Sequence, residues 1–329
     1  MEYPKSRTEW LSLRHKHISS TEVAALFGMS PYSTAFETAV VKQAAEPNPE
    51  FESSERMEWG ICFQHAIAKR IGLVYGVKVR AISGYAIHSY LHCRMGASFD
   101  YEIVGWDWDK VNHSKPPPFT GNPILREMYD KHGAGNLEIK SVDYFVFKDW
   151  RMDDGTIEAP AHIELQVQHQ LACIGRTWAA IGALIGNNHL EVLIRERDDE
   201  VCKAIAAKCE TFWTNLAKGV LPPVDLPADA AIISALYKYA QPGKVLDAQA
   251  DDNIQALCQQ YAEAGRAAKA AEDAKATAKA QLLMKIGDAE KVLVSGYSVS
   301  AGVVGETEIP AYTRKGYRLV RITEKKVKS

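Results

Sequence analysis

The sequence predicts an α/β fold followed by a C-terminal extension made of a long helix and a short β unit. Over residues 1–225, segments with the three-and-four spacing of amphipathic helices are interspersed with segments in which apolar and polar residues alternate, as they do in strands. The prolines at positions 222, 223 and 227 then indicate a boundary. We therefore expect one domain over residues 1–225 and the extension over residues 226–329.

The composition is that of a globular protein. Of the 329 residues, 47% are hydrophobic and 24% are charged, which excludes a wholly disordered chain and a collagen-like fibre. The net charge of −2 argues against a generally basic nucleic-acid binder, so a nucleic-acid partner requires a local basic patch.

Location and redox state are also expected from the composition. The sequence has no run of 18 apolar residues and no apolar signal core at its N-terminus, so we expect a cytoplasmic protein with no membrane contact. The six cysteines form no Cys-x2-Cys pair, which predicts reduced thiols rather than a zinc or iron–sulfur site.

Helices are expected through most of the first 75 residues. Ser19 and Thr34 are each followed three positions later by a glutamate, the capping-box pattern that begins a helix. A further helix is expected over Glu55–Ile71, ending at Gly72. Residues 76–106 then alternate as strands do.

Strands and helices follow one another in the rest of the predicted domain. Residues 107–136 contain three consecutive prolines and predict an insertion loop with a short helix near Ile124–His132. The further elements expected are a strand over residues 136–142, a helix over 160–174, strands over 178–185 and 190–195, and a helix over 199–218.

The extension begins with an alanine-rich helix. Between Ala248 and Ala280, 13 of 33 residues are alanine, and apolar residues from Ile254 to Leu282 follow the spacing of a shallow coiled-coil seam. We expect this seam to pack on the protein itself or on a partner subunit, with direct DNA contact as the alternative. A short β unit is expected over residues 292–294, 297–299 and 317–322, and the tail from Arg314 has seven Lys/Arg and one acid, which suits a phosphate backbone.

Asp100 and the segment Glu138-Ile139-Lys140 are the candidate chemical group. Residues two apart on a strand share a face, so Glu138 and Lys140 should point the same way, and Asp100 from a neighbouring strand can complete a Mg²⁺ site. Lys140 beside such an ion can orient or deprotonate a water, or stabilise developing charge. The spacing alone leaves a strand-edge salt bridge as the alternative, because acid-x-Lys also occurs at Asp273 and Glu324.

Several blocks of sequence in fixed order extend this pattern. They are Trp10-x3-Arg14, Ile18–Ala24, Gly28-Met29-Ser30-Pro31-Tyr32, Trp59-Gly60, Ala97-Ser98-Phe99-Asp100, Leu137-Glu138-Ile139-Lys140, Gln166–Leu171 and Phe212-Trp213. Over residues 7–215 the chain thereby resembles the phage lambda exonuclease and YqaJ-type viral recombinase nucleases of the PD-(D/E)XK superfamily. The resemblance implies a PD-(D/E)XK nuclease core, with a mixed central β-sheet flanked by helices.

The resemblance also implies roles for single residues. Asp100 and Glu138 would be metal ligands, with the backbone carbonyl of Ile139 as a third. Lys140 would be the catalytic lysine, and Gln166 would support the site from its helix.

Two further parts of the site follow from the same resemblance. Gln64 stands where the family usually has a glutamate, so the site is expected to hold one or two Mg²⁺ ions, with Mn²⁺ as a substitute. Arg14, Ser20 and Thr21 would lie where the family holds the 5′-phosphate of a DNA end.

The implied function is Mg²⁺-dependent exonucleolytic digestion of linear double-stranded DNA. The family suggests 5′→3′ polarity, 3′ single strands passed to a single-strand annealing protein, a trimeric homo-oligomer, and action in the cytoplasm of a bacterial host. The alternatives are a structure-specific or single-strand endonuclease of the same superfamily, and a catalytically weak DNA-binding or assembly protein, which Gln64 keeps open. No nucleotide-binding glycine motif occurs.

Overall fold

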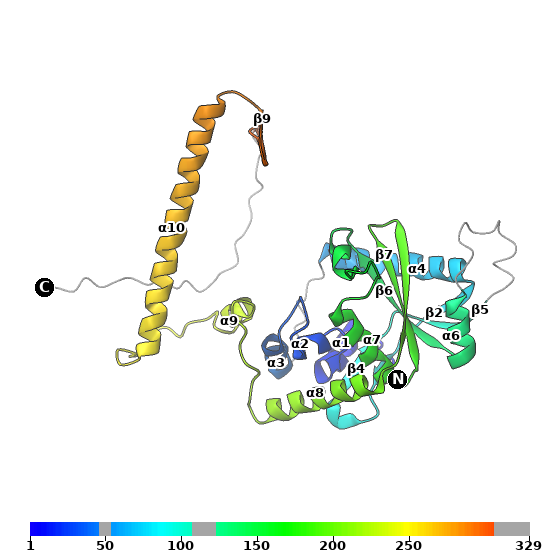
Figure 1. The fold of residues 1–329 in the computed structure, drawn as a ribbon. Coiled ribbons are helices and arrows are strands. Elements are labelled where there is room, and N and C mark those ends of the chain that lie inside the picture. The colour runs from blue at the N-terminus through cyan, green and yellow to red at the C-terminus, as the bar shows by residue number, and fades with distance from the viewer. Residues whose placement is uncertain (46–53, 107–122, 306–329) are drawn as a thin grey trace. The chain divides into compact units, whose positions relative to one another are not determined.

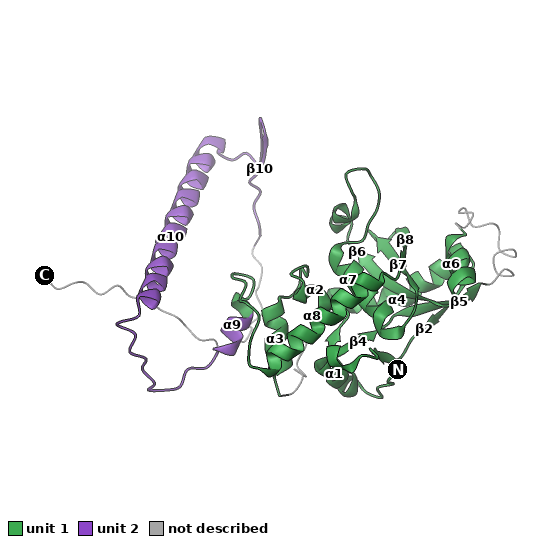
Figure 2. Ribbon diagram, turned by 60° about the horizontal axis from the view of Figure 1, so that its bottom comes forward, with its two compact units in different colours: residues 1–231 green, residues 232–329 purple. Residues whose placement is uncertain are grey.

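The computed structural model describes residues 1–45, 54–106 and 123–305 (Figure 1). The chain divides into two compact units, Met1–Ala231 and Ile232–Ser329 (Figure 2). The boundary expected between residues 225 and 226 lies just before this division, and the expected domain bounds stay a prediction. No helix of the described residues is long and apolar enough to cross a membrane.

A mixed five-stranded sheet forms the centre of unit 1. Its strand order is β2-β5-β6-β7-β8, in which β6 and β7 run parallel and all other neighbours run antiparallel. The sheet implied by the family resemblance is therefore confirmed. Its strands are β2 (Val77–Ala81), β5 (Tyr101–Trp106), β6 (Gly135–Val142), β7 (Trp178–Ile185) and β8 (His189–Glu196).

Helices cover both faces of this sheet (Figure 1). The helices of unit 1 are α1 (Arg7–Lys16), α2 (Val23–Leu26), α3 (Ala35–Gln43), α4 (Glu55–Tyr75), α6 (Ile124–His132), α7 (Ala161–Ile174) and α8 (Asp199–Ala217). Helices α4 and α6 bury Ile71 and Leu125 against one face, next to Leu137 of β6. Helix α7 buries Val167 against the other face, next to Ile181 of β7. The central strands are thus covered on both sides, as parallel pairing requires.

A second, smaller sheet lies under α2 and α7. Its strands are β1 (Ile18–Ser19), β3 (Tyr85–Ile87) and β4 (Met95–Ser98), in the order β1-β4-β3. Strand β1 runs parallel to β4, which pairs Ser19 with Gly96. Because β4 is followed directly by Asp100 and β5, this small sheet connects the first residues of the chain to the central sheet. Two 3-10 turns, Leu91–Cys93 and Val146–Trp150, complete the unit.

One of the two capping predictions is confirmed and the other is wrong. The Thr34 hydroxyl accepts a hydrogen bond from the Glu37 N–H over 2.9 Å and begins α3. Ser19 does not begin a helix: it lies in β1, its hydroxyl donates to the Glu22 carboxylate over 2.8 Å, and α2 begins only at Val23. The sequence pattern does not separate the two cases, because a buried strand residue and an N-cap can both hydrogen-bond a glutamate three positions later.

Helix α4 is one turn longer than its sequence predicts. It continues through Gly72 to Tyr75 and ends at Gly76. Gly76 has φ 63°, a left-handed conformation that favours glycine at a helix C-terminus. The short helix expected over Ile124–His132 is confirmed as α6.

The C-terminal unit contains the long helix and a hairpin. Helix α9 (Ala230–Leu236) begins at the end of unit 1 and continues into unit 2. The other elements of unit 2 are α10 (Asp252–Ile286), β9 (Lys291–Val294) and β10 (Tyr297–Ser300). Strands β9 and β10 pair antiparallel, so the predicted long helix and the first two strands of the β unit are confirmed. Among the described residues, α10 buries none of its side chains. The strand expected over 317–322 and the basic tail lie outside the described residues.

Candidate active site

Strand β6 directs Glu138 and Lys140 to the sheet face that α7 covers. Leu137 and Ile139, the alternate residues, are buried in the cluster under α4 on the opposite face. This is the two-residue periodicity of a strand, and it confirms that Glu138 and Lys140 share a face. Glu138 is only 5% exposed.

Asp100 lies in the turn between β4 and β5, directly beside β6. Its Oδ2 accepts a hydrogen bond from the Ile139 N–H over 2.9 Å. Its Oδ1 accepts one from Nε2 of Gln64, a residue of α4, over 2.9 Å. The carboxylate is therefore oriented by one backbone and one side-chain donor.

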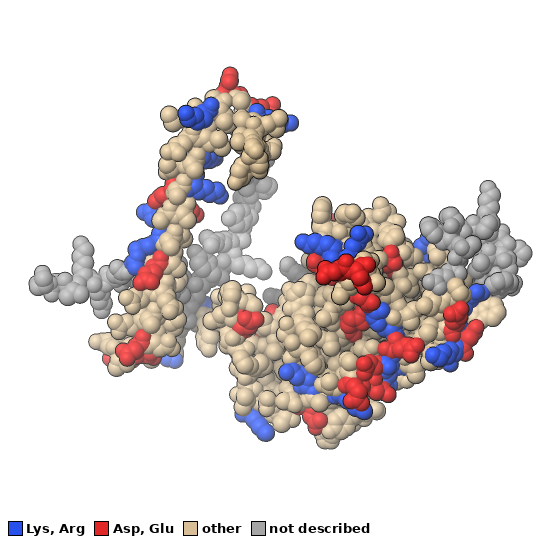
Figure 3. Space-filling model, viewed as in Figure 1, with Lys and Arg blue, Asp and Glu red and all other residues tan. Residues whose placement is uncertain are grey.

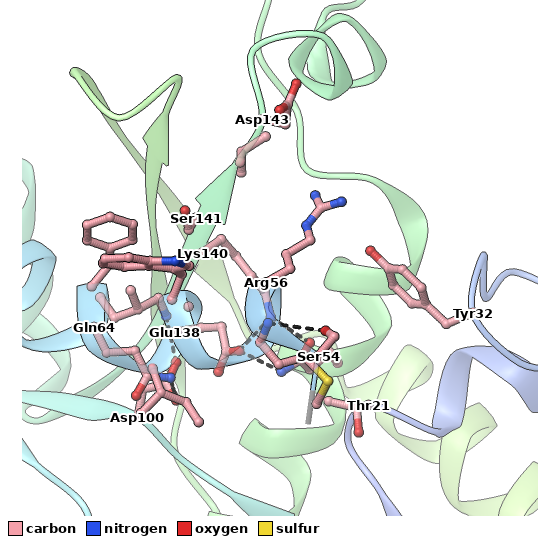
Figure 4. Close-up of a pocket in the computed structure, with 18 of the residues that line it drawn as sticks. Thr21, Tyr32, Ser54, Arg56, Gln64, Asp100, Glu138, Lys140, Ser141 and Asp143 are labelled. Carbon is pink, nitrogen blue, oxygen red and sulfur yellow. Dashed lines mark hydrogen bonds and ion pairs between the residues drawn. The ribbon is translucent and has the colours of Figure 1, made fainter. Parts of the chain in front are cut away.

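Both oxygens of Glu138 are held by donors. Oε1 accepts from Nζ of Lys140 over 2.7 Å and from Nε2 of Gln166 over 2.6 Å, and Oε2 accepts from Nε2 of Gln170 over 2.8 Å. Lys140 also donates to Oε1 of Gln166 over 2.9 Å. Figure 4 shows Glu138 and Lys140 together, with Asp100 and Gln64 beside them.

Gln170 is a site residue that the sequence analysis missed. It lies one helical turn after Gln166 on α7, so both amides point at the same carboxylate. The four-residue spacing of two glutamines on one helix was the available signal, but it carries no information about what the helix faces.

The environment shifts the pKa values of this group. Burial, together with the charge of Glu138, raises the pKa of Asp100 to about 7, against the opposing effect of the Ile139 N–H. Burial alone would lower the pKa of Lys140, but the ion pair with Glu138 raises it instead. Asp100 therefore resists ionisation in this position, and a further cation beside it would favour its charged form.

The donor set fits a hard divalent cation. Such an ion would stabilise the charged form of Asp100, which burial and the charge of Glu138 disfavour. Mg²⁺ is commonly held by one or two carboxylates, with water in the remaining positions. In the described part of the chain, no group of three or more His, Cys, Asp or Glu side chains is placed to hold a metal. Asp100, Glu138 and Ile139, the residues that the family resemblance assigns to a metal, all line the same cleft, and their role as ligands stays a prediction.

Arg14 forms a second polar group together with two hydroxyls. Its Nη2 donates to Oγ of Ser19 over 3.2 Å and to Oγ1 of Thr21 over 3.1 Å. The guanidinium lies 4.7 Å from the ring centroid of Trp10, a cation–π contact. The Trp10 indole in turn donates to Oγ of Ser98 over 2.9 Å, which joins this group to β4.

One cleft of about 1150 Å³ brings these two groups together. Figure 4 shows Thr21 on the opposite side of Glu138 from Gln64. Every residue that the sequence analysis assigned to a site lines this cleft: Arg14, Ser20, Thr21, Gln64, Asp100, Glu138, Ile139, Lys140 and Gln166. Their placement in one cavity is a finding, whereas their roles stay predictions.

Exposed side chains at the cleft were also missed. Arg56 projects from the first turn of α4 into the region shown in Figure 4. Trp59 is 55% exposed and stacks on Phe63 with ring centroids 5.5 Å apart. Tyr144 and Phe145, after β6, are 69% and 80% exposed. Figure 3 shows acidic and basic side chains interspersed on the face in view, so positive charge does not dominate that face.

Comparison with solved structures finds several similar chains. The structure is similar to an alkaline exonuclease from Laribacter hongkongensis, at 17% identity and a TM-score of 0.46, covering 64% of this chain and 93% of that chain. The same exonuclease in complex with dAMP matches at 18% identity with a TM-score of 0.47, over 64% and 93% of the two chains. A phage-related exonuclease from Haemophilus somnus 129PT matches at 11% identity with a TM-score of 0.38, over 64% and 99%.

The family assignment comes from the sequence comparison instead. No curated protein sequence matches the chain. The pattern of the YqaJ-like viral recombinase domain matches residues 9–177, which is 169 of the 329 residues and includes Arg14, Asp100, Glu138 and Lys140. The chain therefore belongs to the YqaJ-like viral recombinase domain family.

Proposed function

We propose that this protein is a metal-dependent deoxyribonuclease that digests linear double-stranded DNA from its ends. One observation carries the proposal: the group of Asp100, Glu138 and Lys140 and the group around Arg14 line the same cleft. The group of Asp100, Glu138 and Lys140 has the chemistry for phosphodiester hydrolysis, and the group around Arg14 has the chemistry to bind a terminal phosphate.

The chemistry assigned to each group follows from its contacts. A Mg²⁺ or Mn²⁺ ion held by Asp100, Glu138 and the Ile139 carbonyl would supply Lewis acidity to the scissile phosphate and lower the pKa of a bound water. Lys140, held by hydrogen bonds to Glu138 and Gln166, donates to the oxygen on which negative charge develops or to the attacking water.

The DNA end is anchored by the second group. Arg14 and Thr21 bind the 5′-phosphate, with Ser20 beside them, and the charge on Arg14 provides the specificity for a phosphorylated end. Anchoring that phosphate in the same cleft as the carboxylates brings the first phosphodiesters of the 5′ strand near them. This arrangement favours 5′→3′ digestion that leaves 3′ single strands.

The remaining parts of the proposal concern partners. The 3′ single strands are passed to a single-strand annealing protein, and the protein acts as a homo-oligomer, a trimer by family expectation, in the cytoplasm of a bacterial host. An endonuclease of the same superfamily is disfavoured because Arg14 and the hydroxyls form a site suited to a terminal phosphate. The second candidate function is a weakly active DNA-binding protein. It is favoured by Gln64, which gives Asp100 a neutral donor where the family usually has a carboxylate.

A gel assay tests these functions against one another. The same plasmid is offered linear and circular in Mg²⁺, and the linear form with and without 5′-phosphates. We expect loss of the linear form alone, faster with the phosphate, and no loss with Lys140→Ala. Lys203→Ala serves as the matched control, because this lysine lies on α8 and is 73% exposed. Cutting of circles would replace the proposal by an endonuclease, and no cutting in Mg²⁺ or Mn²⁺ would replace it by the DNA-binding function.

A further inference from the structure

Lys42 is a buried cation behind the Arg14 group. It lies on α3, and its side chain is 1% exposed. Its Nζ donates to Oε1 and Oε2 of Glu22, each over 2.9 Å, and to the backbone carbonyl of Arg14 over 2.7 Å. A lysine is seldom buried this fully, because the charged form is costly to remove from water unless it is paired. All three of its partner atoms belong to residues next to the cleft.

Glu22, the partner of Lys42, also hydrogen-bonds Ser19. Its Oε2 accepts the Ser19 N–H over 2.8 Å and the Ser19 hydroxyl over 2.8 Å. A serine hydroxyl has one proton, so a hydroxyl that donates to Glu22 can face Arg14 only as an acceptor. It does so at 3.2 Å from Nη2 of Arg14. Because a guanidinium can only donate, Glu22 does not set the direction of this bond, but by taking the Ser19 proton it leaves the lone pairs of that hydroxyl to Arg14.

The charge of Lys42 has a second consequence for Arg14. An unpaired carboxylate at Glu22 would attract the guanidinium and repel a phosphate that approaches it. Lys42 lies against both oxygens of Glu22 and compensates this charge, and it is not among the residues that line the cleft. Arg14 is then free to use its charge on a ligand, while its own main chain is held by the bond from Lys42.

We propose that Glu22 and Lys42 are positioning residues of the 5′-phosphate pocket, which hold Arg14 and Ser19 in place and keep Arg14 available for the phosphate. This inference rests on the proposed function, because that function assigns Arg14 to the phosphate. Neither residue lines the phosphate position itself: among these residues, the cleft is lined by Arg14, Ser19, Ser20 and Thr21.

The test measures end binding rather than digestion. The full chain with Lys140→Ala is titrated onto fluorescent DNA duplexes that end in a 5′-phosphate or a 5′-hydroxyl, and the ratio of the two dissociation constants is recorded. We expect this background to prefer the phosphate by at least about tenfold, the range of one charge-assisted hydrogen bond. Adding Lys42→Met should bring the ratio near one, while the affinity for the hydroxyl end changes by less than about twofold.

Two further variants keep the result interpretable. The double variant Lys42→Met with Glu22→Gln leaves no unpaired buried charge, so it replaces Lys42→Met if that single variant does not fold. It should also lose the preference for the 5′-phosphate. The control pair Lys203→Met with Glu200→Gln removes a similar ion pair from the surface of α8, and it should keep the preference. Melting temperatures establish that each variant is folded.

The outcomes separate this inference from the proposed function. A folded variant that keeps the ratio, or that loses affinity equally for both ends, overturns the positioning role. A parent chain that fails to digest linear DNA overturns the proposed nuclease, while the binding ratio still decides the role of Lys42. A background that binds both ends equally overturns the Arg14 pocket and the positioning role together.

Discussion

Gln170 donates a hydrogen bond from Nε2 to Oε2 of Glu138 over 2.8 Å, while Gln166, one helical turn earlier, donates to the other oxygen over 2.6 Å. Two neutral donors on one helix thus hold a buried carboxylate without neutralising it. The charge of this carboxylate is paired with Nζ of Lys140 at Oε1, and the two amides fix the orientation in which it meets that lysine and any further cation.

Replacing Gln170 should therefore impair the site without unfolding the protein. We expect Gln170→Ala to lower Mg²⁺ affinity or nuclease activity by about 10–100-fold, the range for residues that orient a metal ligand. The amide of Gln168 lies on the same helix but bonds the Glu196 carbonyl and the Asp198 N–H, so Gln168→Ala should lower the melting temperature and retain activity. Activity is measured as acid-soluble nucleotide release. Equal activity losses in both variants would contradict the assignment.

Gln64 determines how much negative charge the cleft carries. Gln64→Glu replaces the donor to Asp100 by a third carboxylate, so we expect a lower melting temperature in EDTA and a larger rise on addition of Mg²⁺. Gln64→Ala removes the hydrogen bond without adding charge and serves as the control. The measurement is a Mg²⁺ titration followed by melting temperature. A Gln64→Glu variant that responds to Mg²⁺ no more than the alanine variant would show that this position does not contact the ion.

We expect the Asp100 carboxylate to lower the melting temperature of the protein when no metal is bound. Burial and the charge of Glu138 disfavour its ionised form, and in EDTA Lys140 offsets this only in part. We expect Asp100→Asn to raise the melting temperature in EDTA by a few degrees and to abolish the stabilisation by Mg²⁺. The exposed Asp154, whose carboxylate bonds Thr156, provides the control Asp154→Asn, which should retain the Mg²⁺ effect. Stabilisation by Mg²⁺ that persists in Asp100→Asn would remove this residue from the ligand set.

His169 makes the stability of the core depend on pH. Its ring is fully buried and hydrogen-bonds the Gly96 carbonyl over 3.1 Å, and burial lowers its pKa to about 4. Because the folded pKa lies below that of the unfolded chain, the neutral ring contributes its full stability above pH 6.5, and this is lost as the pH falls from 6.5 towards 4. The loss is at most about 3 kcal/mol.

Urea denaturation at pH 7.5 and pH 5 measures this effect. His169→Gln retains an N–H donor for the Gly96 carbonyl and does not titrate. We expect the variant to be less stable than the parent at pH 7.5 but to lose less free energy of unfolding between the two pH values. Parallel losses in variant and parent would mean that the acid sensitivity arises from other groups.

Local sequence patterns were sufficient to predict much of the fold and part of the candidate site. Period-two alternation placed Glu138 and Lys140 on one face, and the Thr34 cap and the bounds of α6 follow from residues within one turn of one another. The order of short blocks then identified the family. These features depend only on backbone geometry and on neighbouring side chains, so the sequence by itself determined them.

Tertiary structure alone decided which distant side chains meet. Ser19 matched a helix cap, yet pairing with β4 placed it in a strand, where its hydroxyl serves Glu22 and Arg14. In the sequence, Lys42 is indistinguishable from a solvent-exposed lysine at the end of α3. Its contact with the Arg14 carbonyl arises only because α3 packs against that residue. Gln170 and Glu138 meet only because α7 crosses that face of the sheet. Such contacts depend on how elements pack across the core, and the spacing of residues along one element does not encode this.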